Sequence, residues 1–154
     1  MLKKIAGNLK TQQAQYTYRF YRRYGCASRL CPLTNKIQII SDNRNREEGN
    51  AEDSTTNVGI RLTIPVKQNE GGMFNYVQVF RVSYIKYQQE PEITLIYDKS
   101  IENLEYYGNP ATADLVIDDI GVESLAQYSL EEFSALQTQT IVPQCIESTQ
   151  GYLF

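Results

Sequence analysis

The sequence contains no histidine, no tryptophan and only three cysteines among its 154 residues. Histidine is the commonest general base and the commonest metal ligand, so its absence argues against catalysis and against a metal centre. Cys26, Cys31 and Cys145 are too few, and odd in number, for a disulfide framework, and a zinc site usually needs four Cys or His ligands. We therefore predict no metal, no cofactor and a reducing compartment such as the bacterial cytoplasm.

Several further features are absent from the chain. Residues 1–8 contain two lysines but no apolar run follows them, so they do not resemble a signal peptide. No stretch approaches the ~20 apolar residues that a membrane helix needs. The net charge is −3, from 15 Lys and Arg against 18 Asp and Glu, which lacks the basic excess typical of nucleic-acid binders. The sequence thus predicts neither a membrane nor a nucleic acid as partner.

Catalytic motifs are also missing from the sequence. Gly71 and Gly72 are not followed by the Lys and Ser/Thr of a phosphate-binding loop, and no nucleophile elbow occurs. Asp118, Asp119 and Glu123 do not have the spacing of a twelve-residue calcium loop, and we interpret the aspartate pair as a solvated turn. We therefore predict no catalytic residue. A hydrolase that works through Asp118 and Glu123 stays open as an alternative to the two hypotheses given below.

What the chain has instead is twelve tyrosines and an alternation of apolar and polar side chains that predicts β-strands. Residues 58–66 show this alternation most clearly. In residues 13–24 aromatic side chains share one face, and Tyr21 lies on the polar face as a possible second contact surface. Residues 74–85 carry apolar side chains on both faces, which predicts a central strand. Residues 93–97 then predict the second strand of an antiparallel hairpin.

The remaining segments indicate turns and little helix. Residues 41–57 are polar and predict a long exposed loop. Ser129 and Glu132 fit a capping box, which predicts one or two helical turns through Leu136. Residues 141–154 predict an extended C-terminal segment, broken by proline and glycine.

These patterns predict a mainly β fold, an antiparallel β-sandwich of immunoglobulin or fibronectin type III style with a short helical turn and an extended C-terminal segment. A closed barrel is the alternative. We place the sandwich domain, with its exposed loop 41–57, in residues 1–100. Residues 101–154 are predicted to form a turn-rich extension that leads into an open C-terminal strand.

Exposed tyrosines are the candidate contact residues. Rings on turns can stack on a ligand and hydrogen-bond through their hydroxyls, and aromatic residues are enriched at protein interfaces. The apolar C-terminal residues can form a further contact, because a strand that ends the chain leaves an unpaired edge. The candidate interface or ligand contacts are Tyr21, Tyr87, Tyr106, Tyr107, Tyr152, Leu153 and Phe154. They fit two hypotheses, a structural assembly module and a module that binds glycans or a host surface.

The order of these segments resembles one known family. The resemblance rests on residues 7–10, 15–21, 25, 28 and 32–34, on 59–64, 74–82 and 91–93, and on 146–148 and 151–154. In this order they resemble the β-rich tail proteins, of nozzle or muzzle type, of crAss-like and other short-tailed bacteriophages, over a portion similar to fibronectin type III. The resemblance covers most of the chain.

The resemblance implies a structural component of the virion that is assembled in the bacterial host cytoplasm as a ring in the tail. Its partners would be other virion proteins or copies of itself, and it would lack catalytic residues. In such proteins a passage like residues 152–154 leads into the next strands of a larger β-rich region. The resemblance therefore leaves it open whether this chain is a segment of a longer polypeptide.

Overall fold

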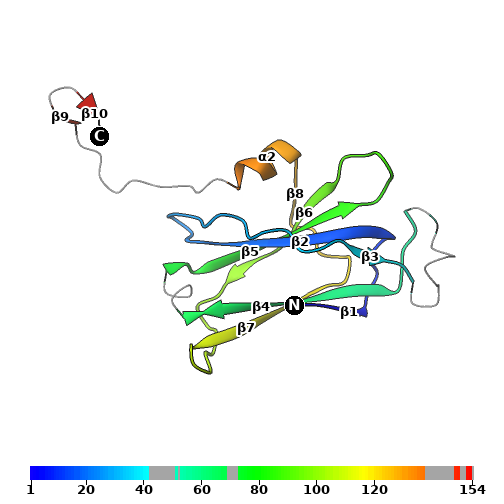
Figure 1. The fold of residues 1–154 in the computed structure, drawn as a ribbon, viewed down its shortest axis with the longest axis horizontal. Helices are drawn as coiled ribbons and strands as arrows, with labels where there is room; N and C mark the ends of the chain where they lie inside the picture. The colour runs from blue at the N-terminus through cyan, green and yellow to red at the C-terminus, as the bar shows by residue number, and fades with distance from the viewer. Residues whose placement is uncertain (42–50, 52, 69–72, 138–147, 150–151, 154) are drawn as a thin grey trace.

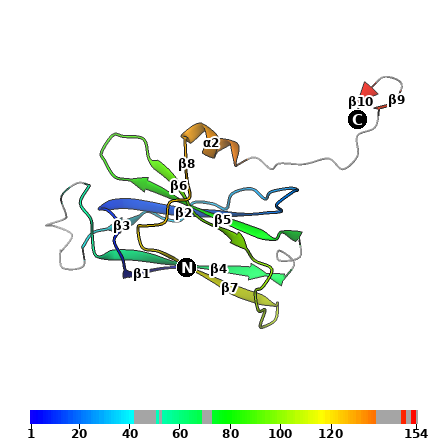
Figure 2. The ribbon, with the colours of Figure 1, turned by 180° about the vertical axis from the view of Figure 1, so that it is seen from behind.

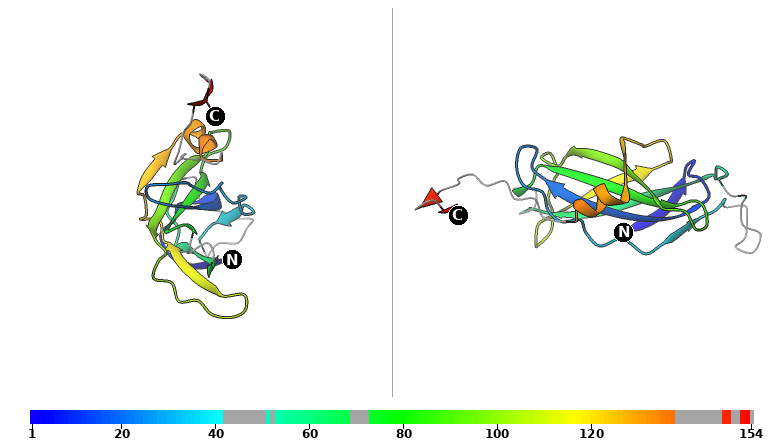
Figure 3. Two further views of the ribbon diagram at one scale, coloured as in Figure 1. Left: turned by 90° about the vertical axis from the view of Figure 1, so that its left-hand side faces the viewer. Right: turned by 90° about the horizontal axis from the view of Figure 1, so that it is seen from above.

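Two antiparallel sheets pack face to face and form the body of the fold (Figure 1). A computed structural model describes residues 1–41, 51, 53–68, 73–137, 148–149 and 152–153. The first sheet has three strands in the order β1 (Leu2–Ala6), β4 (Val58–Lys67) and β7 (Thr112–Asp119). The second has five, in the order β3 (Ile37–Ile39), β2 (Gln12–Tyr21), β5 (Tyr76–Tyr84), β6 (Glu92–Ser100) and β8 (Ala126–Tyr128). In Figure 3 the long strands run side by side along the sandwich.

The prediction of an antiparallel β-sandwich with a short helix is confirmed. The connectivity is less simple than a series of hairpins, because β1 pairs with β4 instead of with the next strand along the chain. Immunoglobulin constant domains place strands A and B beside each other in one sheet. The likeness to that class therefore concerns the layered architecture, while the strand order is that of this chain.

Strand β5 is buried on both faces, as the sequence predicted. Val77 and Val79 face the three-stranded sheet and belong to the main core between the layers. Phe80 and Val82 face the other way and form a second apolar cluster with residues of β6 and with Phe133. A bulge in β6 shifts the register at this point, since Leu95 and Tyr97 lie opposite Phe80 and Val79. Central position and two-sided burial explain the continuous apolar pattern of this strand.

Helix α2 (Leu130–Ala135) covers the second cluster. Its capping box is confirmed: the Ser129 hydroxyl accepts from the Glu132 amide, and the Glu132 carboxylate accepts from the Ser129 amide. Phe133 is its buried residue and packs edge-on against Phe80, with the ring centroids 5.8 Å apart. The helix lies on the side of the five-stranded sheet that faces away from the three-stranded sheet (Figure 2). No helix among the described residues is long and apolar enough to span a membrane.

The segment after residue 100, predicted as an extension of the sandwich, contributes β7 and β8 to the two sheets. Ile101, Leu115 and Ile117 are buried in the main core. Near the end of the chain, β9 (Ser148–Thr149) and β10 (Tyr152–Leu153) pair antiparallel. The sequence pattern did not predict a strand at residues 112–119, which form β7.

Two other predictions concern residues 13–57. Strand β2 ends at Tyr21, and Tyr24 lies in a turn with 92% of its surface exposed, so its predicted place on the buried face is wrong. In the predicted loop 41–57, residues 42–50 and 52 lie outside the described residues. Its last part returns to the sandwich, where Thr56 is buried and its hydroxyl donates to the Leu9 carbonyl.

The chain passes from one sheet to the other at residues 7–9, which we call the crossing. The Asn8 amide donates to the Ile120 carbonyl at 2.7 Å and the Leu9 amide donates to the Val58 carbonyl at 3.0 Å. Backbones approach so closely here that a Cβ on Gly121 would lie 2.7 Å from the Asn8 carbonyl oxygen. The crossing thus holds the end of β7 against the start of β4.

Candidate functional site

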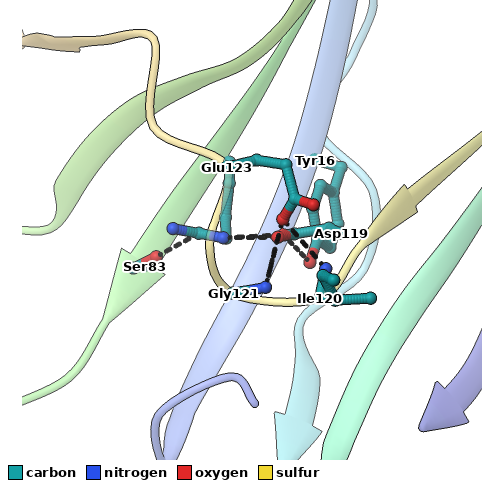
Figure 4. Close-up of polar contacts among 7 residues, drawn as sticks. Tyr16, Ser83, Asp119, Ile120, Gly121 and Glu123 are labelled. Atoms are coloured by element: carbon teal, nitrogen blue, oxygen red, sulfur yellow. Dashed lines mark hydrogen bonds and ion pairs between the residues drawn. The ribbon is translucent and has the colours of Figure 1, made fainter. Parts of the chain in front are cut away.

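A buried polar cluster joins the two sheets next to the crossing (Figure 4). Asp119, the last residue of β7, has no exposed surface. Arg81 reaches it from β5, with Nη1 lying 2.7 Å from Oδ1 and 2.8 Å from Oδ2. The Tyr16 hydroxyl, from β2, donates to Oδ2 at 2.9 Å. The Gly121 amide donates to Oδ1 at 3.3 Å, so one carboxylate accepts donors from both layers of the sandwich.

The interpretation of Asp118 and Asp119 as a solvated turn is wrong, because both residues belong to strand β7 and Asp119 is buried. The turn follows one residue later, where the Glu123 carboxylate accepts from the amides of Ile120 and Gly121. Asp118 faces outward and forms a bidentate pair with Arg61, at 2.7 Å for each bond. The two neighbouring aspartates point to opposite faces because side chains alternate along a strand.

Burial dominates the electrostatics of the cluster. It raises the pKa of the Asp119 carboxyl, and the Arg81 guanidinium, the Tyr16 hydroxyl and the Gly121 amide oppose that rise. Burial and the neighbouring carboxylate raise the pKa of the Tyr16 phenol. The Arg81 Nε donates to the Ser83 hydroxyl at 3.2 Å. A carboxylate with no exposed surface and three donor residues has no position left for a substrate, so the cluster is structural.

The candidate tyrosines lie apart from this cluster and from one another. Tyr21 is half-buried on β2, where its hydroxyl donates to Asp98 and its ring packs on Tyr76. Tyr107 is exposed, and its hydroxyl donates to Asp114 of β7, in the three-stranded sheet. The structure therefore does not gather these tyrosines into one site.

The other candidate residues have separate surroundings. Tyr106 is partly buried and packs against the main core. Tyr87 is 87% exposed and lines a groove of about 520 Å³ at the end of β5. The groove is rich in amide side chains: Gln12, Gln13, Gln38, Gln88 and Gln89. Glycan binding stays a prediction.

The C-terminal candidates and the cysteines complete the comparison. Tyr152 and Leu153 belong to β10, while Phe154 and Cys145 lie outside the described residues. Cys26 and Cys31 are both partly buried. Within the described ranges no group of three or more His, Cys, Asp or Glu side chains could hold a metal ion.

The comparison with known families decides the identity. The sequence matches the Crassvirus muzzle proteins over residues 1–154. The chain belongs to the Crassvirus muzzle protein family. It is a structural protein of the phage tail, and the resemblance to muzzle-type tail proteins of crAss-like phages is confirmed. No curated protein matches its sequence.

In this muzzle protein the buried cluster joins the two sheets, and we expect its tyrosine to make the fold sensitive to alkaline pH. The folded chain keeps the Tyr16 proton above the ordinary phenol pKa of 10.0, whereas the unfolded chain loses it. The free energy of unfolding therefore falls as pH rises above 10, by about 1.4 kcal/mol per pH unit for this group. We expect Tyr16→Phe to make that fall shallower by this amount in urea unfolding between pH 9 and 11.5.

The stability of Tyr16→Phe at neutral pH is the reference for this comparison. There the variant loses one buried hydrogen bond to a carboxylate, which costs about 1.5–3 kcal/mol. The other tyrosines titrate alike in both proteins, so the difference between the two slopes belongs to Tyr16. Parallel slopes above pH 10 would show that the buried phenol does not hold its proton.

Proposed function

We propose that the chain is a subunit of a ring in the phage tail and acts through protein–protein packing, without catalysis. The observation that carries this proposal is the family match over the whole chain, residues 1–154. Its partners are other virion proteins or further copies of itself, and it is assembled into the particle in the host cytoplasm. The saturated state of the buried cluster supports a role without chemistry, because its ionisable groups face each other and not a substrate.

Exposed apolar side chains on the sandwich also support a packing role. Val122 and Leu125, between β7 and β8, are 71% and 61% exposed, and Met73 is 62% exposed. Single exposed apolar residues are common on soluble proteins, but an assembly subunit needs such surface to bury against its neighbours. These residues are therefore available for contacts in the particle.

Purified phage particles test the proposal. We expect mass spectrometry to find peptides of this chain in gradient-purified virions at the abundance of other tail proteins. Gold-labelled antibodies against the chain should mark the tail in electron micrographs. A phage replication enzyme, which should be absent from purified virions, serves as the negative control. Recovery of the chain only in the particle-free lysate, or labelling confined to the capsid, would contradict the proposal.

A further inference from the structure

In the part of the chain that the structure describes, both edge strands of the three-stranded sheet have an open side. Strands β1 and β7 both pair with β4, which lies between them. Among the described residues, no other strand pairs with β1, and β7 is covered on its open side only at Thr112, which bridges to Tyr107. An unpaired edge presents free N–H and C=O groups, so each can accept a further strand.

The side chains on the outer face of this sheet form rows that cross the three strands. In one row Lys3 lies opposite Arg61, and Arg61 lies opposite Asp118. Arg61 holds Asp118 in a bidentate pair at 2.7 Å. The row therefore ends on a lysine at the β1 edge and on a carboxylate at the β7 edge.

The adjacent row has apolar side chains at both ends. The Thr63 amide donates to the Met1 carbonyl, and Thr63 lies opposite Val116 of β7. Met1 is 91% exposed and Val116 is 52% exposed. On the outer face, the β1 edge thus carries the apolar Met1 and, two residues later, the cation Lys3. The β7 edge carries the apolar Val116 and, two residues later, the anion Asp118.

We infer that β7 of one copy of the chain pairs with β1 of the next copy, so that the three-stranded sheet continues across the interface. This inference rests on the proposed function and names the surface through which the subunits join. β1 and β7 are each antiparallel to β4 and so run in the same direction, which makes the new pairing parallel. The rows of the two copies continue into each other when Val116 lies beside Met1 of the next copy and Asp118 lies beside its Lys3. Cross-strand pairs of these kinds stabilise sheets.

Charge also selects against the alternative pairings. Two β1 edges would bring Lys3 and Lys4 of one copy against the same lysines of the other, and two β7 edges would bring aspartates together. Like charges directly opposite destabilise a sheet, and edge lysines are a known guard against unwanted pairing. The contact is therefore between unlike edges, and contacts of this type generate closed rings or open filaments.

Two variants of the full chain test the interface, each blocking one edge. Lys3→Glu/Lys4→Glu reverses the charge of the β1 edge and leaves β7 intact. Val116→Lys places a cation on the β7 edge, at an exposed position, and leaves β1 intact. Lys86→Glu is the control, because it makes the same kind of charge change on an exposed residue beside the five-stranded sheet. Molar mass is measured by light scattering over a range of protein and salt concentrations.

We expect the wild-type chain and Lys86→Glu to associate beyond a dimer as concentration rises, and less so at high salt. Each edge variant alone should remain monomeric over the range in which the wild type associates, because its reversed or added charges raise the dissociation constant at least about tenfold. An equal mixture of the two edge variants should form a dimer and stop there, since each retains one intact and complementary edge. That rescue also shows that both variants are folded.

Three outcomes would overturn the inference. A wild-type chain that stays monomeric at all concentrations excludes the contact. Edge variants that associate like the wild type assign self-association to another surface. A mixture that stays monomeric, with both variants folded by circular dichroism, shows that the two edges do not meet. In each case the chain can still be found in purified virions, so the function and the interface fail separately.

Discussion

Arg81→Met is expected to lower the free energy of unfolding by about 3–5 kcal/mol, the cost of leaving a buried charge without its partner. In the folded chain the Arg81 guanidinium is the only cation on Asp119 among its described contacts, at 2.7 and 2.8 Å. Methionine fills similar space but cannot donate. The Asp119 carboxylate then keeps only the Tyr16 hydroxyl and the Gly121 amide, in a site with no exposed surface. Urea unfolding at pH 7 measures the loss.

A matched control separates burial from ion pairing as such. Arg61→Met removes the partner of Asp118, the neighbour of Asp119 on β7, from an exposed pair that also has two hydrogen bonds, each of 2.7 Å. Exposed pairs of this kind contribute at most about 1 kcal/mol, so this variant should remain near wild-type stability. In Arg81→Met/Asp119→Asn, removal of the second charge should recover part of the loss. Equal losses for Arg81→Met and Arg61→Met would show that the buried pair has no special role.

The sequence predicted the strands whose pattern is uninterrupted. Residues 58–66 alternate without a break, and residues 74–85 are apolar on both faces because β5 is central. It did not predict β7, whose outer face carries Asp114 and Asp118. These charges made the segment resemble a turn, although Ala113, Leu115 and Ile117 alternate with them and are buried. A half-buried strand with a charged outer face is thus the element that single-sequence reasoning loses.

The buried contact between Asp119 and Arg81 could not be predicted from any local sequence pattern. Asp119 has the parity of the buried residues Leu115 and Ile117, and Arg81 has the parity of Val77 and Val79. Parity therefore suggests two charges that point inward, on segments 38 residues apart. Only the strand order brings them together, because β7 and β5 belong to different sheets and meet across the core. The family, by contrast, was accessible from the order of segments along the chain.

Gly121→Ala is the second substitution with a large expected effect. Gly121 has φ +94°, a conformation that L side chains rarely adopt, and it lies against the crossing. An added Cβ would lie 2.7 Å from the Asn8 carbonyl oxygen and 2.9 Å from the Leu9 amide nitrogen. Both atoms are backbone, and the Asn8 amide is held by its bond to Ile120. The new methyl group therefore cannot be accommodated by rotating a side chain.

Gly108→Ala is the control that divides this cost into two parts. Gly108 also has a positive φ, +79°, but the nearest atom to an added Cβ is 3.8 Å away. Its loss should be the conformational cost alone, about 1–2 kcal/mol. Gly121→Ala adds an overpacking cost of about 1–3 kcal/mol. Urea unfolding should therefore rank Gly121→Ala well below Gly108→Ala in stability, and two equal values would mean that the crossing yields. Because Gly121 also donates to Asp119, a shifted crossing disturbs the buried cluster, and the alanine should weaken both contacts between the sheets together.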